Sequence, residues 1–545
     1  MVDLKTRPFY LTEEEISWIK NQTNSLTIEQ KIGQLFLVLG DSFSDEKLQE
    51  LVKSSRVGGI LFRPASKNEI KNKISYLNKI SRNPLIFAAN CEEGASGAIS
   101  DGISFGSQMS LAACDDSKLV ESFAKSIVKE AKEVGINWTF SPVSDIDMNY
   151  QNPIMNIRTL GSNANKVKRY ATIQAKTFQH YGLIACAKHF PGDGVDYRDQ
   201  HLHPSVNSLT AKRWRLTYGS IYKNLIKNDL LSIMVGHILL PSIEKEIDPN
   251  LKDNQCLPAS LSSNLIQGLL RKELDFNGLV ITDATIMGGY TMMMNRKKAL
   301  VTSINSGIDM FCFNTDFEED YNFLLESYKS GELNNERLND ALLRIFAIKA
   351  KTIFEKGAPI RINTKKVAEM VADKSITLVK NEQNILPIAP EKYPNIRLII
   401  LGKDEIDGEK LSLYAKDELE KNGFNVTIYK RDEDAMHGVG GLSTKRLTLY
   451  IANYPTLSNQ TTIRISFNPI HALDTPRFPY EEPYIFLSLG NPYHLQDVPK
   501  VKVYINGYGC TKTIFNASLN KLLGLSPFLG KSPVDAFCGL VDTHY

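Results

Sequence analysis

The stretch LIACAKHF at residues 183–190 is a short run of apolar and small residues that ends in Lys188 and His189. Because it does not alternate between apolar and polar positions, it predicts a strand that is buried on both faces, as in a parallel sheet. Seven further runs of this kind occur in the first two thirds of the chain. They are LFLVLG at 35–40, GGILF at 58–62, PLIFAAN at 84–90, INWTFSPV at 136–143, LSIMVGHI at 231–238, GLVITDA at 278–284 and GIDMFCFN at 307–314.

Helical patterns lie between several of these runs. The clearest is LVESFAKSIVKEAKEVG at 119–135, whose apolar positions follow the spacing of one helix face. Eight buried strands that alternate with helices indicate an α/β fold, a TIM-type (β/α)8 barrel. A large doubly wound sheet would give the same local pattern and is the alternative.

A second series of strand patterns follows a Lys-rich helical stretch near residues 330–375. The segment KGAPIRINTKK at 356–366 is expected to be a linker. The sequence therefore predicts a catalytic barrel domain at 1–355 and a C-terminal α/β sandwich domain at 367–545. The strands expected in the second domain are IRLIILG at 396–402, FNVTIYK at 424–430, RLTLYIAN at 446–453, TIRISF at 462–467, PYIFLSLG at 483–490 and VKVYING at 501–507.

The composition is that of an ordinary globular protein, with 42% hydrophobic and 23% charged residues. A formal net charge of +3 over 545 residues is too small to indicate nucleic acid or an anionic membrane as the main partner. No stretch approaches the roughly 18 apolar residues of a membrane span, and the N-terminus has no secretory pattern. The 7 cysteines are scattered and never spaced C-x-x-C, so we expect a reducing, cytoplasmic location.

Polar side chains follow the expected strands where a barrel gathers its functional groups, at the carboxyl ends. Several carboxylates and imidazoles would meet there, without a phosphate-cradling glycine loop. Such a set suits cleavage of a glycosidic bond, in which one group protonates the leaving oxygen and another stabilises or attacks the anomeric carbon. The residues are Asn90, Glu92, Glu93, Asp145, Asp147, Lys188, His189, Asp193, Asp196, Asp199, His201, His203, His237 and Asp283.

The segment KHFPGDGVDYRDQHLHP at 188–204 is the most informative. Asp199 and His201 lie two residues apart, and a carboxylate bonded to an imidazole fixes its tautomer and raises its basicity. Gly192 and Gly194 allow unusual backbone angles and movement of the loop. The segment therefore predicts an acid/base group on a loop next to a strand end.

These segments resemble a known family. KHFPGDGVDYRDQH is similar to the K-H-F-P-G-[HD]-G-x4-D-x-H signature of the β-N-acetylglucosaminidases of glycoside hydrolase family 3. GLVITDA resembles the nucleophile strand of that family, NIRTLG at 156–161 its substrate-binding arginine segment, and LPASLS at 257–262 also matches. KSITLVKNEQNILPI at 374–388 resembles the start of the second, α/β domain, so the resemblance runs from about Ile32 to the C-terminus.

The resemblance implies a role for each matching residue. Asp283 would be the nucleophile and His201 the general acid/base, supported by Asp199. Lys188, His189 and Arg158 match sugar-binding positions. Three positions depart from what many members have. Asn90 stands where many have an Asp that grips sugar hydroxyls, Asp193 stands where many have a His, and Gln200 replaces a small hydroxyl residue.

Four other residues have weaker assignments. His237 is either a core histidine or a sugar contact. Asp145 is expected to bind sugar or to orient Arg158 rather than to hold a metal, since one Asp pair without a histidine cluster is a weak metal signal. Glu92 and Glu93 are interpreted as structural more than catalytic.

The resemblance implies a retaining glycosidase that removes terminal β-linked N-acetylglucosamine from oligosaccharides or muropeptide-type fragments through a covalent glycosyl-enzyme. The only partner expected is a small carbohydrate substrate, with no metal or organic cofactor, and the oligomeric state is left open. Phosphorolysis by the same site and β-glucosidase activity are the alternatives among enzymes. A sugar-binding protein on an inactive scaffold is the alternative from another class, and the intact Asp283, Asp199 and His201 argue against it.

Overall fold

A computed structural model of the chain describes residues 2–382, 384–429, 445–467 and 474–544. The contacts divide the chain into two compact units. The first consists of Met1–Ile103, Val120–Asn152 and Ala164–Asn363, and the second of Ser104–Leu119, Pro153–Asn163 and Thr364–Tyr545. The second unit thus includes two segments that precede the expected linker, and the domain boundary at 356–366 stays a prediction.

The first unit contains a closed barrel of parallel strands, in the order β1-β10-β9-β7-β5-β4-β3-β2. All eight predicted runs form its strands, so the (β/α)8 prediction is confirmed and the doubly wound sheet is excluded. The strands are β1 (Phe36–Leu39), β2 (Gly59–Leu61), β3 (Ile86–Ala89), β4 (Trp138–Thr139), β5 (Ile184–Phe190), β7 (Ser232–Val235), β9 (Leu279–Ala284) and β10 (Met310–Cys312).

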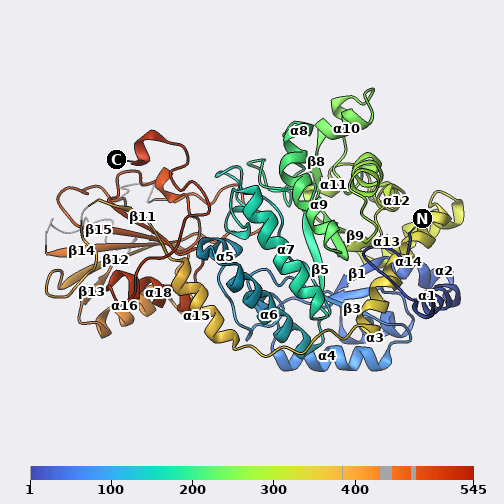
Figure 1. Cartoon of the computed structure of the whole chain (residues 1–545), viewed down its shortest axis with the longest axis horizontal. Coiled ribbons are helices and arrows are strands. Elements are labelled where there is room, and N and C mark those ends of the chain that lie inside the picture. Colours follow the sequence, from blue (N-terminus) through green and yellow to red (C-terminus); the bar gives the residue numbers. More distant parts are fainter. Residues whose placement is uncertain (1, 383, 430–444, 468–473, 545) are drawn as a thin grey trace. The chain divides into compact units, whose positions relative to one another are not determined.

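Helices surround these strands, as Figure 1 shows for α4, α7 and α12. The predicted helix at 119–135 is confirmed as α6 (Ser117–Val134). The two short strands β6 (Ser205–Val206) and β8 (Ile238–Leu239) pair with each other outside the barrel. The other helices include α1 (Glu13–Ser25), α2 (Ile28–Gly33), α3 (Asp45–Lys53), α4 (Lys67–Ile80), α7 (Ala164–His180), α8 (Ala211–Trp214), η3 (Arg215–Gly219), α9 (Ser220–Lys227), α10 (Pro241–Ile247), η5 (Asn264–Glu273), α11 (Gly288–Thr291), α12 (Arg296–Ser306), α13 (Phe317–Ser330) and α14 (Asn335–Phe354).

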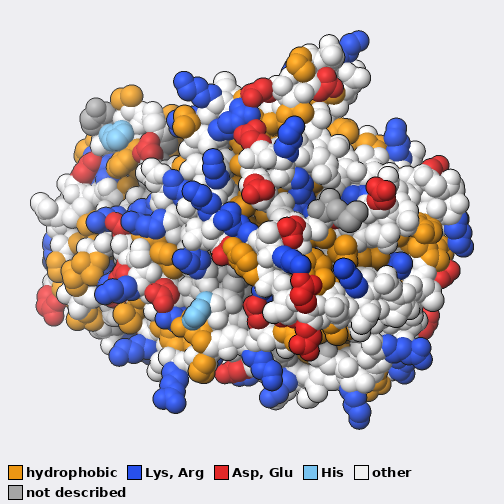
Figure 2. Space-filling model, turned by 45° about the vertical axis from the view of Figure 1, so that its right-hand side comes forward, with side chains coloured by type: hydrophobic (Ala, Val, Ile, Leu, Met, Phe, Trp, Pro, Cys, Tyr) orange, Lys and Arg blue, Asp and Glu red, His pale blue; other side chains and the backbone are white. Residues whose placement is uncertain are grey.

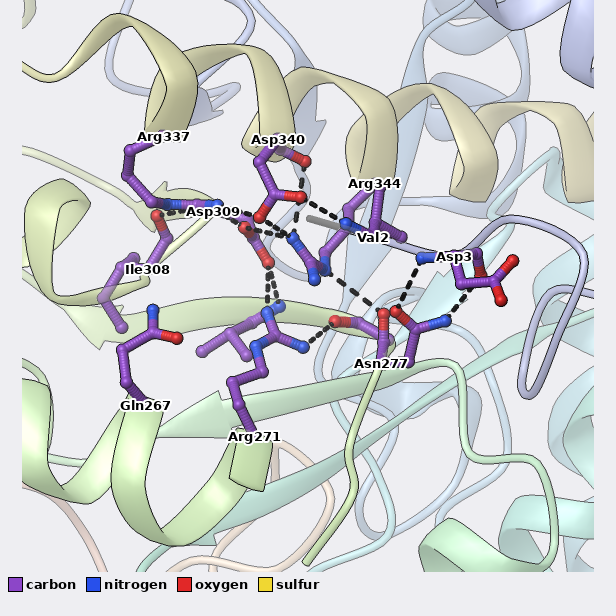
Figure 3. Close-up of polar contacts among 12 residues, drawn as sticks. Val2, Asp3, Gln267, Arg271, Asn277, Ile308, Asp309, Arg337, Asp340 and Arg344 are labelled. Carbon is purple, nitrogen blue, oxygen red and sulfur yellow. Dashed lines mark hydrogen bonds and ion pairs between the residues drawn. The ribbon is translucent and has the colours of Figure 1, made fainter. Parts of the chain in front are cut away.

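A network of arginines and aspartates closes the amino ends of β9 and β10 (Figure 3). The Asp309 carboxylate accepts from Arg271 Nη2 at 3.0 Å and from the backbone N–H of Val280 at 2.8 Å. Arg337 pairs with both Asp309 and Asp340. A cavity of about 740 Å³ lies beside this network, and the arginines that face it are paired with carboxylates. This end of a barrel normally serves stability, and the paired charges agree with that role.

The second unit contains a six-stranded sheet in the order β11-β16-β15-β14-β12-β13, in which only β11 is antiparallel to its neighbour. Alternate residues of its strands enter two cores: Leu398 belongs to one and Leu401 to the other. The sheet is therefore covered on both faces, which explains its continuous apolar runs. Its strands are β11 (Thr377–Asn381), β12 (Asn395–Gly402), β13 (Asn425–Ile428), β14 (Arg446–Asn453), β15 (Tyr484–Ser488) and β16 (Val503–Asn506), and its helices include α5 (Gln108–Cys114), η2 (Asn156–Arg158), α15 (Thr364–Ser375), α16 (Leu411–Lys421), η6 (His494–Gln496) and α18 (Lys512–Leu522).

Five of the six strands predicted for this unit are confirmed, and the last residue of one predicted run, 430, lies outside the described residues. The strand predicted at 462–467 is wrong. Ile463 and Ile465 are buried, which produced the alternating pattern. However, their backbone groups bond to side chains: Ile465 N–H donates to Asp497 and Ile463 C=O accepts from Asn491. The segment is therefore irregular, and strand β11 at Thr377–Asn381 was not predicted.

The face in Figure 2 carries basic and acidic side chains mixed together, as expected for a small net charge. Among the described residues, no helix is long and apolar enough to cross a membrane.

Candidate active site

Asp283 lies at the end of β9, the position that barrel enzymes use for chemistry. Its side chain is 14% exposed at the end of an otherwise buried strand, and Oδ1 accepts from the backbone N–H of Ala284 at 2.8 Å. Burial alone would raise the pKa of Asp283, but His189, His237, His201 and that N–H together hold the pKa below its usual value. The residue is therefore a carboxylate at neutral pH.

His189 lies between two carboxylates. Its Nδ1 is 2.7 Å from Asp145 Oδ2, and its Nε2 is 3.8 Å from Asp283 Oδ2. Asp145 is fully buried and also accepts from the backbone N–H groups of His189 and Asp193. These contacts indicate that Asp145 orients His189 and the loop after β5. The predicted role of Asp145, to bind sugar or to orient Arg158, stays a prediction.

Lys188 connects two residues of the segment that follows β3. Its Nζ donates to Asn90 Oδ1 at 3.1 Å and lies 2.5 Å from Glu92 Oε1. The Lys188 side chain is 3% exposed and that of Glu92 is 12% exposed. Glu92 therefore belongs to the cluster, and its ion pair with Lys188 is compatible with the structural role that the sequence indicated. Its place two residues after Asn90, at the same strand end, had put it in the predicted polar set.

His201 and Asp199 form the predicted pair. Asp199 Oδ1 lies 2.7 Å from His201 Nδ1 and also accepts from the His201 backbone N–H at 2.9 Å. Asp199 is buried, whereas the His201 side chain is 25% exposed. Because the carboxylate engages Nδ1, Nε2 is the nitrogen that can exchange a proton with a bound substrate.

The loop between β5 and the Asp199–His201 pair requires glycine at positions 192 and 194. Gly192 has a φ of +120° and Gly194 a φ of +94°, a region that favours glycine. A Cβ on Gly192 would lie 2.2 Å from the Tyr218 ring, and one on Gly194 would lie 2.1 Å from the carbonyl oxygen of Ile146. The loop is therefore closely packed against its surroundings.

His237 is fully buried, and both ring nitrogens are hydrogen-bonded within the protein. Nδ1 is 2.9 Å from Ser260 Oγ, and Nε2 is 3.0 Å from the carbonyl oxygen of Ala284. Burial lowers the pKa of His237 to about 4. A neutral imidazole that donates from Nε2 holds the strand end beside Asp283, which fits the core histidine that the sequence offered as one of two readings, and a sugar contact stays a prediction.

Arg158 lies on η2 of the second unit, where its Nη1 donates to the carbonyl oxygen of Ile154 at 3.2 Å. Its role in sugar binding stays a prediction. Within the described ranges, no group of three or more histidine, cysteine, aspartate or glutamate side chains could hold a metal ion.

A barrel with carboxylates and imidazoles grouped at the carboxyl ends of its strands has the groups that an enzyme of the glycosidase class needs. A family model described as the glycosyl hydrolase family 3 N-terminal domain matches residues 27–348. The chain belongs to glycoside hydrolase family 3 and is a glycoside hydrolase. The family resemblance found in the sequence is confirmed.

Individual relatives match the chain over at least 95% of its length. A beta-N-acetylglucosaminidase/beta-glucosidase of Cellulomonas fimi is 36% identical over 564 residues, which is 100% of each chain. The solved structure of the beta-glucoside phosphorylase BglX has a TM-score of 0.91 and 38% identity, and the match covers 99% of both chains. A family 3 beta-N-acetylglucosaminidase of Paenibacillus, with a TM-score of 0.79 and 24% identity over 95% of this chain and 100% of that chain, shares the fold.

Proposed function

We propose that the enzyme removes terminal β-linked N-acetylglucosamine by a double displacement at Asp283. The observation that carries this proposal is an ionised Asp283 at the end of β9, with an Asp199–His201 pair on the loop after β5. The similarity to the Cellulomonas fimi beta-N-acetylglucosaminidase/beta-glucosidase supports the choice of sugar.

The proposed reaction has two steps, formation and hydrolysis of a covalent glycosyl-enzyme. In the first, an Asp283 oxygen bonds to the anomeric carbon as the bond to the aglycone breaks, and His201 Nε2 gives its proton to the leaving oxygen. In the second, His201 Nε2 takes a proton from water, and the water oxygen replaces Asp283 at the anomeric carbon. The sugar keeps its β configuration.

The remaining residues would bind and orient the sugar. Lys188, Asn90, His189 and Arg158 are proposed to contact its hydroxyl groups, and Glu92 would align Lys188. We place the enzyme in the cytoplasm on its scattered cysteines, none of them spaced C-x-x-C.

Phosphate is a second candidate acceptor for the glycosyl-enzyme. The structure of the beta-glucoside phosphorylase BglX, 38% identical to this chain, supports this candidate. An imidazole is neutral or cationic, so His201 would repel an incoming phosphate less than a carboxylate would.

The test compares aryl β-N-acetylglucosaminide with aryl β-glucoside, each with and without inorganic phosphate, and identifies the products by NMR. Faster turnover of the N-acetylglucosaminide to free sugar supports the main proposal. Formation of a sugar 1-phosphate, with a rate that rises with phosphate concentration, would establish phosphorolysis instead. Equal or faster turnover of the glucoside would move the enzyme to β-glucosidase activity.

A further inference from the structure

The segment that carries the acid/base is bonded directly to the segment that follows the nucleophile. The backbone N–H of Gly288 donates to the carbonyl oxygen of His201 at 2.8 Å, and that of Gly289 donates to the carbonyl oxygen of Gln200 at 3.1 Å. A Cβ on Gly288 would lie 2.1 Å from the Leu202 carbonyl oxygen, and one on Gly289 would lie 2.7 Å from His237 Cβ. Only glycine at these two positions permits such a close approach.

The Gln200 side chain makes a second connection. It is 1% exposed. Oε1 accepts from the backbone N–H of His237 at 2.8 Å, and Nε2 donates to Asp193 Oδ2 at 3.1 Å. Gln200 therefore joins His237, two residues after the end of β7, to the loop after β5. A serine or threonine at this position would be too short to reach both partners.

His237 extends this connection to the nucleophile. Its backbone N–H holds Gln200, while its ring holds the carbonyl oxygen of Ala284, the residue after Asp283. The path from the acid/base to the nucleophile thus runs through Gln200 and His237. Each link in it is a hydrogen bond between buried groups, and such groups are costly to leave unpaired.

The rest of the loop after β5 is held as well. Tyr218 Oη donates to the Asp193 carbonyl oxygen at 2.5 Å, and Asn207 Nδ2 donates to the Gly192 carbonyl oxygen at 3.0 Å. Asn152 Nδ2 donates to the carbonyl oxygen of Asp196 at 2.8 Å. These contacts oppose the movement that the loop glycines allow, and they favour a loop that is already in place.

We propose that Gln200 is a positioning residue that fixes His201 relative to Asp283 before substrate binds. This inference rests on the proposed acid/base role of His201. Proton transfer requires close alignment of the donor and the leaving oxygen. Loss of Gln200 should therefore weaken the proton transfer specifically, and not sugar binding or nucleophilic attack.

The test is the variant Gln200→Met, which keeps the side-chain length and removes both hydrogen bonds. The matched control is Gln179→Met. Gln179 accepts from the Leu231 backbone N–H, as Gln200 does from that of His237, and it donates to the Asp229 backbone carbonyl oxygen at the opposite end of β7. The measurement is kcat/KM for a series of glycosides whose leaving groups range from dinitrophenol to an alkyl alcohol.

For Gln200→Met we expect the decrease in kcat/KM to be at least about tenfold greater for the alkyl glycoside than for the dinitrophenyl glycoside, because only the poor leaving group needs the proton. Gln179→Met should show one small loss for all leaving groups. Amide hydrogen exchange at Gly288 and Gly289 should accelerate in Gln200→Met only. A loss from Gln200→Met that is equal across the series would overturn the positioning role.

A donor–acceptor exchange gives an independent check. Gln200→Glu alone places its carboxyl group against that of Asp193. The double variant Asp193→Asn with Gln200→Glu restores a hydrogen bond, with position 193 as the donor and position 200 as the acceptor. Recovery of the leaving-group dependence in the double variant supports the inference, and additive losses contradict it. His201→Ala in the same series separates the two proposals. A flat profile for His201→Ala would overturn both, and a steep one beside a flat Gln200→Met profile would overturn only this inference.

Discussion

The barrel and the C-terminal sheet each contain a fully buried histidine in the same three-part arrangement. In the barrel, Ser260 Oγ lies 2.9 Å from His237 Nδ1, and Nε2 bonds to the Ala284 carbonyl oxygen at 3.0 Å. In the second unit, Ser488 Oγ lies 3.0 Å from His494 Nδ1, and Nε2 bonds to the Ile463 carbonyl oxygen at 3.4 Å. Burial lowers the pKa of both histidines to about 4.

The two regions differ in what adjoins the histidine. His237 holds the strand end that carries the carboxylate Asp283, whereas the strands of the second sheet end in the neutral residues Asn453, Ser488 and Asn506. Asn453 Nδ2 donates to the Lys403 carbonyl oxygen at 2.9 Å, so this side chain secures its own loop. A buried serine–histidine pair thus supports a strand end in either unit, and reactivity comes from ionised groups placed beside it.

The largest expected effect comes from replacing the charged Asp283 at the end of β9 by a neutral residue, as at the strand ends of the second sheet. Asp283→Asn keeps the shape of the side chain and removes the nucleophile, so turnover should fall by about four orders of magnitude or more while folding is retained. The measurement is steady-state kinetics with an aryl glycoside, together with labelling of the wild-type enzyme by a 2- or 5-fluoro glycosyl donor and peptide mapping.

Asp316→Asn is the matched control, because Asp316 caps helix α13 and asparagine caps equally well. It should leave turnover within about twofold of wild type, as surface caps do not touch the chemistry. A labelled peptide without Asp283, or near-normal turnover in Asp283→Asn, would remove Asp283 from the nucleophile role.

The next largest effect concerns His201. His201→Ala should lower kcat/KM by about a thousandfold with a sugar aglycone and far less with a nitrophenyl leaving group, since only the poor leaving group needs general acid catalysis. With the nitrophenyl substrate, a burst followed by slow turnover is expected, because the same residue activates water in the second step. Stopped-flow and steady-state measurements of phenol release check both.

Azide should partly restore turnover in His201→Ala, because azide needs no general base. Asp199→Ala should show the same pattern more weakly, because the imidazole stays in place. An equal loss for all leaving groups without azide rescue would mean that another residue, such as Glu92 or Glu93, supplies the proton.

The barrel could be predicted because its eight strands are buried on both faces and leave continuous apolar runs in the sequence. The failure at 462–467 has a physical cause, since alternating burial of Ile463 and Ile465 does not require strand pairing when side chains take the backbone hydrogen bonds. Strand β11 lies at the edge of its sheet, and its burial is mixed. Its pattern is correspondingly weak.

The candidate site could be predicted as far as strand ends and short spacings reveal it. Asp199 and His201 are two residues apart, so their hydrogen bond is local. The bond between His189 and Asp145 spans 44 positions and that between Lys188 and Asn90 spans 98. Such partners depend on how the strands are arranged around the barrel, and a single sequence gives residue types at the strand ends without their pairing.

The buried histidines predict a pH dependence of stability in both units. Their folded pKa of about 4 lies below the unfolded value of about 6.5. Between these values the unfolded chain binds protons that the folded chain does not, so the free energy of unfolding falls as pH drops from about 6.5 to about 4. Each histidine should contribute a decrease of up to about 3 kcal/mol.

Urea unfolding of His237→Gln and His494→Gln against pH measures this effect. Each variant should be less stable than wild type at pH 7, and the difference should shrink toward pH 4. Turnover at pH 7 should fall more in His237→Gln than in His494→Gln, because only His237 holds the segment beside Asp283. Parallel stability curves for wild type and both variants would rule out buried neutral histidines as the cause.

The smallest expected effect concerns Asn90, which follows β3 and is neutral, like the residues at the strand ends of the second sheet. Asn90 Oδ1 accepts from Lys188 Nζ at 3.1 Å, and Glu92 already provides a carboxylate to the same ammonium group. Asn90→Asp keeps the acceptor, so kcat/KM should change by less than about tenfold, mainly through KM. Asn90→Leu removes the acceptor and leaves part of a buried ammonium group unpaired, which should lower kcat/KM by about 10- to 100-fold. Steady-state kinetics with the preferred aryl glycoside distinguishes the two variants. Equal losses in Asn90→Asp and Asn90→Leu would mean that the neutral amide itself is required. The Asn90 side chain would then act by donating its N–H to the sugar, and not by aligning Lys188.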